Sequence, residues 1–82
     1  MERNTLSIVA KNQPGTLVKV ATLISGRGLN IHELTARVME DTEFTVIDVD
    51  FLGEAEKLRQ VRTQLGKLEV VREVTLISAE QE

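Results

Sequence analysis

The sequence contains no cysteine, tryptophan or tyrosine, one proline and two phenylalanines. Without cysteine, the chain can form neither disulfide bonds nor cysteine-ligated metal sites. A domain of 82 residues buries only roughly 60% of its unfolded surface and is marginally stable alone. Self-association is the remaining source of extra apolar burial. We therefore expect a homodimer or a larger homo-oligomer.

Strong charge of one sign is also missing, because the formal net charge is only -3 and the Lys and Arg residues form no long run. Phosphate-backbone binding draws on clustered cations, and base stacking draws on exposed aromatic rings. Phe44 and Phe51 instead fall in one apolar stretch. No apolar run approaches the roughly 18 residues of a membrane span, and residues 1–4 are too polar for a signal peptide. We expect a cytoplasmic protein with no nucleic-acid or membrane partner.

What is present is typical of a folded globular domain, with 41% hydrophobic and 28% charged residues. We expect residues 1–82 to form one domain with a core from about residue 4 to residue 78. Alternating apolar residues at 5–10 predict a strand with one buried side. Leu17, Val20, Ala21 and Ile24 follow at helical spacing. This helix is predicted to begin near Pro14 with Asn12 or Gln13 as its cap, and to end at the glycines of residues 25–28.

The second half of the chain predicts two strands, a helix and a last strand. Apolar residues alternate over 29–39 with a change of phase, which indicates a strand with a bulge. After a polar connection, Thr45, Ile47, Val49 and Phe51 share one face of a third strand, opposite Asp48 and Asp50. The second helix has a stripe of Ala55, Leu58, Val61, Leu65 and Leu68 and ends near residues 66–67, and the last strand covers 70–78.

This order predicts an α+β fold of the ferredoxin-like βαββαβ type, with two helices on one face of a four-stranded antiparallel sheet. In the usual strand order of this fold, 4-1-3-2, the second strand lies at an edge of the sheet. An edge strand can pair with the same strand of a second copy.

Catalytic chemistry is poorly represented, because the chain has one histidine, His32, and no nucleophile with an evident base. His32 lies in a predicted strand, where an ordinary polar role is the simpler interpretation and a place beside a ligand or subunit boundary is the alternative. Asp48 and Asp50 project from one face about 7 Å apart, but hard cations need six or more oxygens. A solvated sheet face explains both aspartates more simply. We predict no catalytic residue, no metal and no cofactor.

Two segments resemble ACT domains: NQPGTLVKVA at 12–21 and LISGRGLNI at 23–31. More narrowly, they resemble the amino-terminal ACT domain of the small, regulatory subunit of acetolactate synthase, whose motif runs N-x-P-G-x-L-x-R-V and then L-F-x-R-R-G-x-N-I-x-x-L-T. The sequence QLGKL at 64–68 is similar to a further family segment, Q-L-x-K-L. Lys19 stands where the family often has arginine, and residues 36–44 lack the family's proline.

The resemblance implies a regulatory domain without catalytic activity. In that family the ACT domain binds a branched-chain amino acid, typically valine, at a dimer interface and passes feedback inhibition to a separate thiamine-dependent catalytic subunit. The implied partners are a free amino acid, a second copy of the chain and a catalytic subunit. The alternative is a ligand-free assembly domain that docks onto an enzyme subunit.

The predicted ligand site lies at the start of the first helix, where unpaired backbone N–H groups and the helix dipole favour a carboxylate. Asn12 and Asn30 match motif positions that contact the ligand in the family, so the resemblance implies that both are ligand contacts. A side-chain amide can accept a hydrogen bond from an ammonium and donate one to a carboxylate. Pairing two edge strands would bring Asn30 near the Asn12 loop of the second copy. The structural alternative is that these residues are only a cap, a turn and core. The predicted ligand-binding residues are Asn12, Gln13, Pro14, Gly15, Thr16, Leu17, Val18, Asn30 and Ile31.

Overall fold

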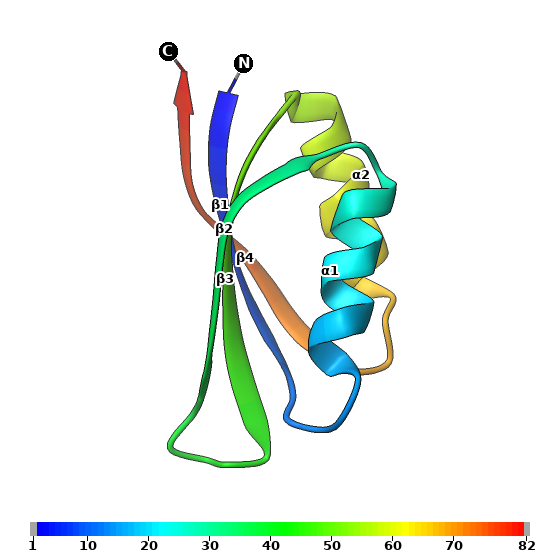
Figure 1. The fold of residues 1–82 in the computed structure, drawn as a ribbon, viewed down its shortest axis with the longest axis vertical. Coiled ribbons are helices and arrows are strands. Elements are labelled where there is room, and N and C mark those ends of the chain that lie inside the picture. Colours follow the sequence, from blue (N-terminus) through cyan, green and yellow to red (C-terminus); the bar gives the residue numbers. More distant parts are fainter. Residues whose placement is uncertain (1, 82) are drawn as a thin grey trace.

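A computed structural model describes residues 2–81 as one antiparallel sheet with both helices packed on the same side (Figure 1). The elements in chain order are β1 (Glu2–Lys11), α1 (Thr16–Gly26), β2 (Asn30–Val38), β3 (Phe44–Gly53), α2 (Ala55–Gly66) and β4 (Val71–Gln81). The predicted βαββαβ order and α+β class are therefore confirmed. Within this part of the chain, neither helix is long and apolar enough to cross a membrane.

The sheet has the strand order β2-β3-β1-β4, so β1 and β3 are central and β2 and β4 are the edges. All neighbouring strands are antiparallel, and Ile8 of β1 lies opposite Ile47 of β3. The predicted edge position of β2 is confirmed. One side of β2 pairs with β3, and its other side faces away from the sheet.

The change of phase in β2 is a break in its pairing with β3. Ile31 pairs with Phe51 and Glu33 pairs with Asp50, which leaves His32 as the extra residue. Strict alternation would place Ile31 and Leu34 on opposite faces, whereas both pack against the core. The predicted bulge is confirmed, and it keeps the following residues of β2 in register with the buried positions of β3.

The core lies between the sheet and the helices. The predicted inward residues of β1 and β3 are buried except Thr45, which is half-buried, and Leu58, Val61 and Leu65 of α2 are buried too. Leu68 is partly buried against the same cluster, while the side chain of Ala55 lies outside the described part. The fully buried members of the cluster include Leu6, Ile8, Ala10, Val20, Ile24, Ile47, Val49, Phe51, Val61 and Leu65.

The start of α1 differs from the prediction. The helix begins at Thr16, and its N-cap is Gly15 in the left-handed region with φ of +86°. Neither Asn12 nor Gln13 is the cap, because the left-handed glycine turns the backbone into the helix without a side-chain bond. At the other end, the predicted left-handed glycine is Gly28, with φ of +81°.

Candidate functional site

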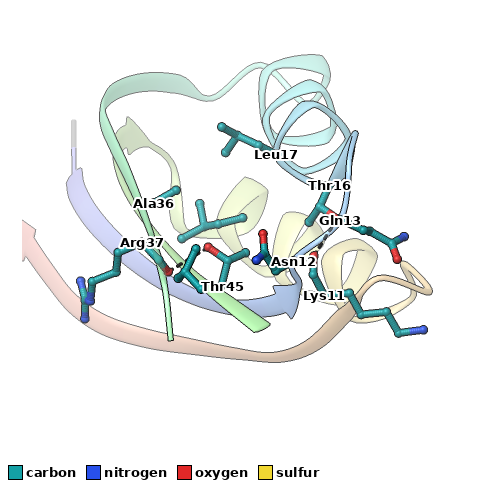
Figure 2. A pocket seen from close by; sticks show the side chains of 10 residues that line it. Lys11, Asn12, Gln13, Thr16, Leu17, Ala36, Arg37 and Thr45 are labelled. Atoms are coloured by element: carbon teal, nitrogen blue, oxygen red, sulfur yellow. Dashed lines mark hydrogen bonds between the residues drawn. The ribbon is translucent and has the colours of Figure 1, made fainter. Parts of the chain in front are cut away.

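A hollow of about 250 Å³ lies at the end of the sheet where β1 leads into α1 and β2 approaches the β2–β3 hairpin (Figure 2). Three segments form it: the β1–α1 loop with the first turn of α1, the last residues of β2, and the first half of β3. Its lining residues are Lys11, Asn12, Gln13, Thr16, Leu17, Ala36, Arg37, Val38, Thr45 and Ile47.

The polar side of the hollow is the β1–α1 loop, which hydrogen bonds hold in place. The Thr16 hydroxyl donates to the Lys11 carbonyl oxygen at 2.8 Å. The Asn12 side-chain amide donates to the carbonyl oxygen of Thr42 at 3.0 Å, and the Asn12 backbone N–H donates to the backbone carbonyl oxygen of Glu43 at 2.8 Å. Asn12 therefore joins the loop to the β2–β3 hairpin, and its amide oxygen is left as an acceptor.

The apolar side of the hollow is formed by α1, β2 and β3. Leu17 projects from α1 toward the strand that carries Ala36 (Figure 2), and it is 43% exposed. Ile47 is fully buried, and it lies opposite Ala36 in the β2–β3 register. Val38 adds a further apolar surface. An aliphatic group placed between Leu17 and Ala36 would replace water at both of them.

The electrostatic setting of the hollow favours an anion. Lys11 and Arg37 are its charged lining residues, and no Asp or Glu of residues 2–81 lines it. Both cationic side chains extend outward (Figure 2), and Arg37 is paired with Asp48 at 3.5 Å, so Arg37 adds little positive potential to the hollow. The first turn of α1 contains no acidic residue and no side chain of the described chain caps it. Its backbone N–H groups add positive potential at the polar side.

The structure brings together part of the predicted ligand set. Asn12, Gln13, Thr16 and Leu17 line the hollow, and Pro14 and Gly15 form the turn directly before α1. Val18 is 67% exposed and is not part of the lining.

Asn30 and Ile31 lie elsewhere within one chain. Asn30 pairs with Leu52 near the end of β3, whereas Lys11, next to Asn12, pairs with Phe44 at its start. The two predicted asparagines are thus at opposite ends of the sheet. A single copy of the chain does not bring them to one site.

Several lining residues were missed by the sequence analysis, namely Lys11, Ala36, Arg37, Val38, Thr45 and Ile47. The sequence could have indicated Ala36 and Val38, because the alternation of apolar residues after the predicted bulge places both on the helix side of β2. The sequence pattern does not show how β2 pairs with β3, and this pairing places Ala36 opposite Ile47.

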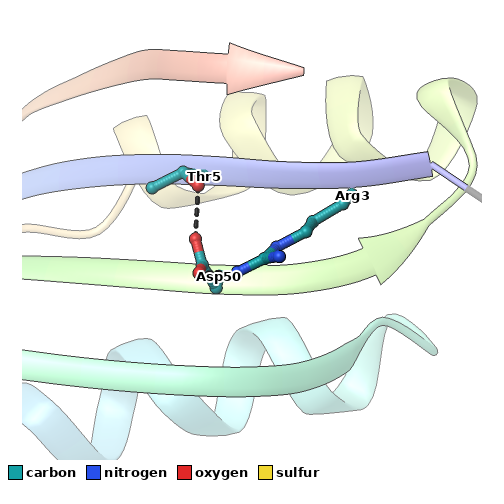
Figure 3. A network of polar contacts seen from close by, with 3 residues as sticks. All are labelled: Arg3, Thr5 and Asp50. Atoms are coloured by element: carbon teal, nitrogen blue, oxygen red, sulfur yellow. Dashed lines mark hydrogen bonds and ion pairs between the residues drawn. The ribbon is translucent and has the colours of Figure 1, made fainter. Parts of the chain in front are cut away.

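The two aspartates of β3 belong to the other face of the sheet. Asp50 accepts hydrogen bonds from the Thr5 hydroxyl and from Arg3, whose guanidinium is 3.0 Å away (Figure 3). The bond from Thr5 first, and then Arg3, lower the pKa of Asp50 below its usual value. Asp48 lies 3.5 Å from Arg37. Each aspartate thus has a cationic partner on a polar sheet surface.

Among the side chains that the structure describes, large exposed apolar ones occur in two places. Leu17 and Val18 on α1 and Val38 and Met39 at the end of β2 are exposed around the hollow. Leu76 and Ile77 are exposed on β4, at the opposite edge of the sheet. The first set includes Val38, the last residue of the edge strand β2, and we refer to these four residues as the β2-edge patch.

The element order, the strand order and a hollow between the first helix and an edge strand fit an ACT domain. Residues 6–73 match the family described as the AHAS small subunit-like ACT domain, and the chain belongs to this family. This is the family of acetolactate synthase small subunits that the segments at 12–21 and 23–31 resemble.

Individual relatives agree with this assignment. The acetolactate synthase small subunit of Buchnera aphidicola subsp. Baizongia pistaciae is 36% identical over 81 residues, which cover 99% of this chain and 51% of the relative. The crystal structure of the acetolactate synthase small subunit from Thermotoga maritima superposes with a TM-score of 0.83 at 30% identity, covering 93% of this chain and 47% of that one. The chain thus spans about half the length of the curated relatives it matches.

The fold is shared more widely. The ACT domain of a GTP pyrophosphokinase from Chlorobium tepidum superposes with a TM-score of 0.76 at 20% identity, covering 92% of this chain and 96% of that one. This likeness concerns the fold alone.

Proposed function

We propose that this chain is a cytoplasmic regulatory domain that binds a free amino acid, of the branched-chain type such as valine, and has no catalytic activity of its own. The amino acid controls a separate catalytic subunit of acetolactate synthase or of a related biosynthetic enzyme. The observation that carries the proposal is the hollow, which combines a helix N-terminus and the cationic Lys11 with an aliphatic wall.

Each part of an amino acid has a chemical counterpart in the site. The carboxylate suits the backbone N–H groups at the start of α1, which Gly15 leaves open because it has no side chain. The ammonium suits the Asn12 amide oxygen, since the amide nitrogen is already engaged with Thr42. The aliphatic side chain suits the surface formed by Leu17, Ala36 and Val38.

A second copy of the chain would complete the site. β2 has a free edge, and antiparallel pairing of two β2 strands about a twofold axis sets the start of one strand beside the end of the other. Asn30 and Ile31 of one copy then approach the hollow of the second copy, next to Val38. This arrangement accounts for two predicted ligand residues that lie far from Asn12 within one chain.

The β2-edge patch supports the same dimer. Leu17, Val18, Val38 and Met39 are between 37% and 67% exposed, and association at β2 would cover them. Since the ligand would contact both copies, ligand binding and dimer geometry would be thermodynamically linked. The amino acid would favour the arrangement that it bridges, and an attached catalytic subunit would respond to that shift.

The test is a thermal-shift screen of the protein against the twenty amino acids, followed by titration calorimetry. A ligand that binds only the folded dimer raises the melting temperature. We expect stabilisation by valine, leucine or isoleucine that is lost in Asn12→Ala and Asn30→Ala. Gln60→Ala is the matched control, because Gln60 is an exposed amide on α2, far from the hollow in sequence and outside its lining.

The absence of any shift at millimolar amino acid in a confirmed dimer would contradict amino-acid sensing. That result would favour the alternative, a ligand-free assembly domain, for which the β2-edge patch is sufficient. Co-purification with a catalytic subunit, unaffected by any amino acid, would then be the expected behaviour.

A further inference from the structure

The helix-facing side of β2 carries a row of four apolar residues with one small member. In order along the strand they are Ile31, Leu34, Ala36 and Val38, and the last three lie opposite Val49, Ile47 and Thr45 of β3. Ile31 and Leu34 are half-buried and pack against the core. At Ala36 the row recedes, and the hollow lies at this point.

The missing volume has a visible consequence on α1. Leu17 projects toward β2 at the level of Ala36 (Figure 2), yet it remains 43% exposed. A branched side chain at position 36 would cover Leu17, bury more apolar surface and suit a strand better than alanine does. The chain lacks this favourable packing beside the hollow.

We propose that Ala36 is the residue that sets the size of the ligand side chain. Its methyl group leaves a space bounded by Leu17 and Ile47, and the aliphatic group of the bound amino acid fills it. This inference rests on the proposed function, since it concerns the selectivity of the same site. It adds a residue that the ACT motif segments at 12–21 and 23–31 do not contain.

Filling the space from the β2 side should shift selectivity toward smaller amino acids. One methylene group in an apolar pocket changes discrimination by about 10- to 200-fold, and Ala36→Val adds two methyl groups. We expect affinity for leucine and isoleucine to fall at least about tenfold, with a smaller loss for alanine. Enlarging the space from the α1 side, by Leu17→Ala, should shift the preference toward longer side chains.

The experiment is calorimetric titration of the wild type and both variants with alanine, valine, leucine and isoleucine. Thr35→Val is the matched control, because Thr35 is the neighbouring residue of β2, pairs with Asp48 and faces the other side of the sheet. Its ranking of ligands should equal that of the wild type. Circular dichroism without ligand checks that each variant is folded.

The outcomes separate this inference from the proposed function. Opposite shifts in ligand ranking for Ala36→Val and Leu17→Ala support it. A wild-type ranking in both variants overturns it and leaves amino-acid sensing intact. If Ala36→Val does not fold, the Leu17→Ala ranking alone decides, because Leu17 is half exposed and is not part of the core. A wild-type protein that binds no amino acid overturns both proposals.

Discussion

The hydroxyl group of Thr16 donates a hydrogen bond to the backbone carbonyl oxygen of Lys11 at 2.8 Å. Thr16 is the first residue of α1 and is only 2% exposed, whereas Lys11 is the last residue of β1. The bond therefore closes the loop that carries Asn12 and Gln13. The polar side of the hollow depends on this closure.

Replacing Thr16 by valine should weaken both the fold and the site. Valine has nearly the same shape but no hydroxyl, so the Lys11 carbonyl oxygen loses the bond from Thr16 and keeps that from the Gln13 backbone N–H. We expect the free energy of unfolding to fall by about 1–2 kcal/mol. Denaturant titration measures this change, and Thr16→Ser, which keeps the hydroxyl, should recover most of it. No loss in Thr16→Val together with a loss in Thr16→Ser would show that the methyl contact matters and the hydrogen bond does not.

Gly15, the N-cap of α1, and Gly26, its last residue, offer a second prediction. A Cβ atom at Gly15 or at Gly26 would meet no atom within 4 Å, but only Gly15 has a positive φ. Gly15→Ala should therefore destabilise by about 1–2 kcal/mol through backbone strain alone. Gly26→Ala should be neutral or stabilising, because alanine is the better helix residue. Thermal denaturation of the two variants side by side checks the difference, and equal melting temperatures would contradict it.

The sequence predicted the fold because its periodic patterns coincide with burial. The phase change between Ile31 and Leu34 appears as a bulge at His32, and the helical stripe of α2 forms its buried face. Strand ends were less accurate. β1 and β4 extend beyond the predicted 5–10 and 70–78, because backbone pairing of Glu2 with Gln81 needs no apolar side chain.

The site was predicted only in its local part. Gln13 and Leu17 are close to Asn12 along the chain, so a motif can place them together. Ala36 and Ile47 reach the hollow through strand pairing, which no local pattern encodes. The observed role of Asn12 also differs from the predicted helix cap, because its side chain donates a hydrogen bond to Thr42 in the β2–β3 hairpin.

The Asp50 network predicts a pH dependence of stability. The Thr5 and Arg3 contacts lower the pKa of Asp50 below 3.8 in the folded state. The contribution of Asp50 to the free energy of unfolding is therefore complete at a pH above the pKa that Asp50 has in the unfolded chain. The contribution disappears as the pH falls through the lowered folded pKa. Arg3 is partly exposed, so we expect no more than about 1 kcal/mol at neutral pH.

Denaturant titrations of the wild type and Asp50→Asn between pH 2 and pH 7 check this sign. The variant should be less stable at neutral pH, and the gap should close as the pH falls below about 4. Asp41→Asn is a useful comparison, because Asp41 lies in the exposed β2–β3 hairpin without an ion pair to any described residue. A gap that widens in acid would contradict the assignment.

The two apolar edges of the sheet allow a direct test of where the copies associate. Val18 on α1 is 67% exposed and Ile77 on β4 is 59% exposed, so an aspartate at either position leaves the core intact. In a β2-edge dimer, Val18→Asp would place a charge against an apolar surface, and desolvating that charge costs several kcal/mol. Light scattering should therefore show a monomer, or a dissociation constant raised by at least about 100-fold. Ile77→Asp should remain a dimer and keep its amino-acid response. The opposite pattern, a dimer lost only in Ile77→Asp, would place the interface at β4 and leave Asn30 without a role in the site.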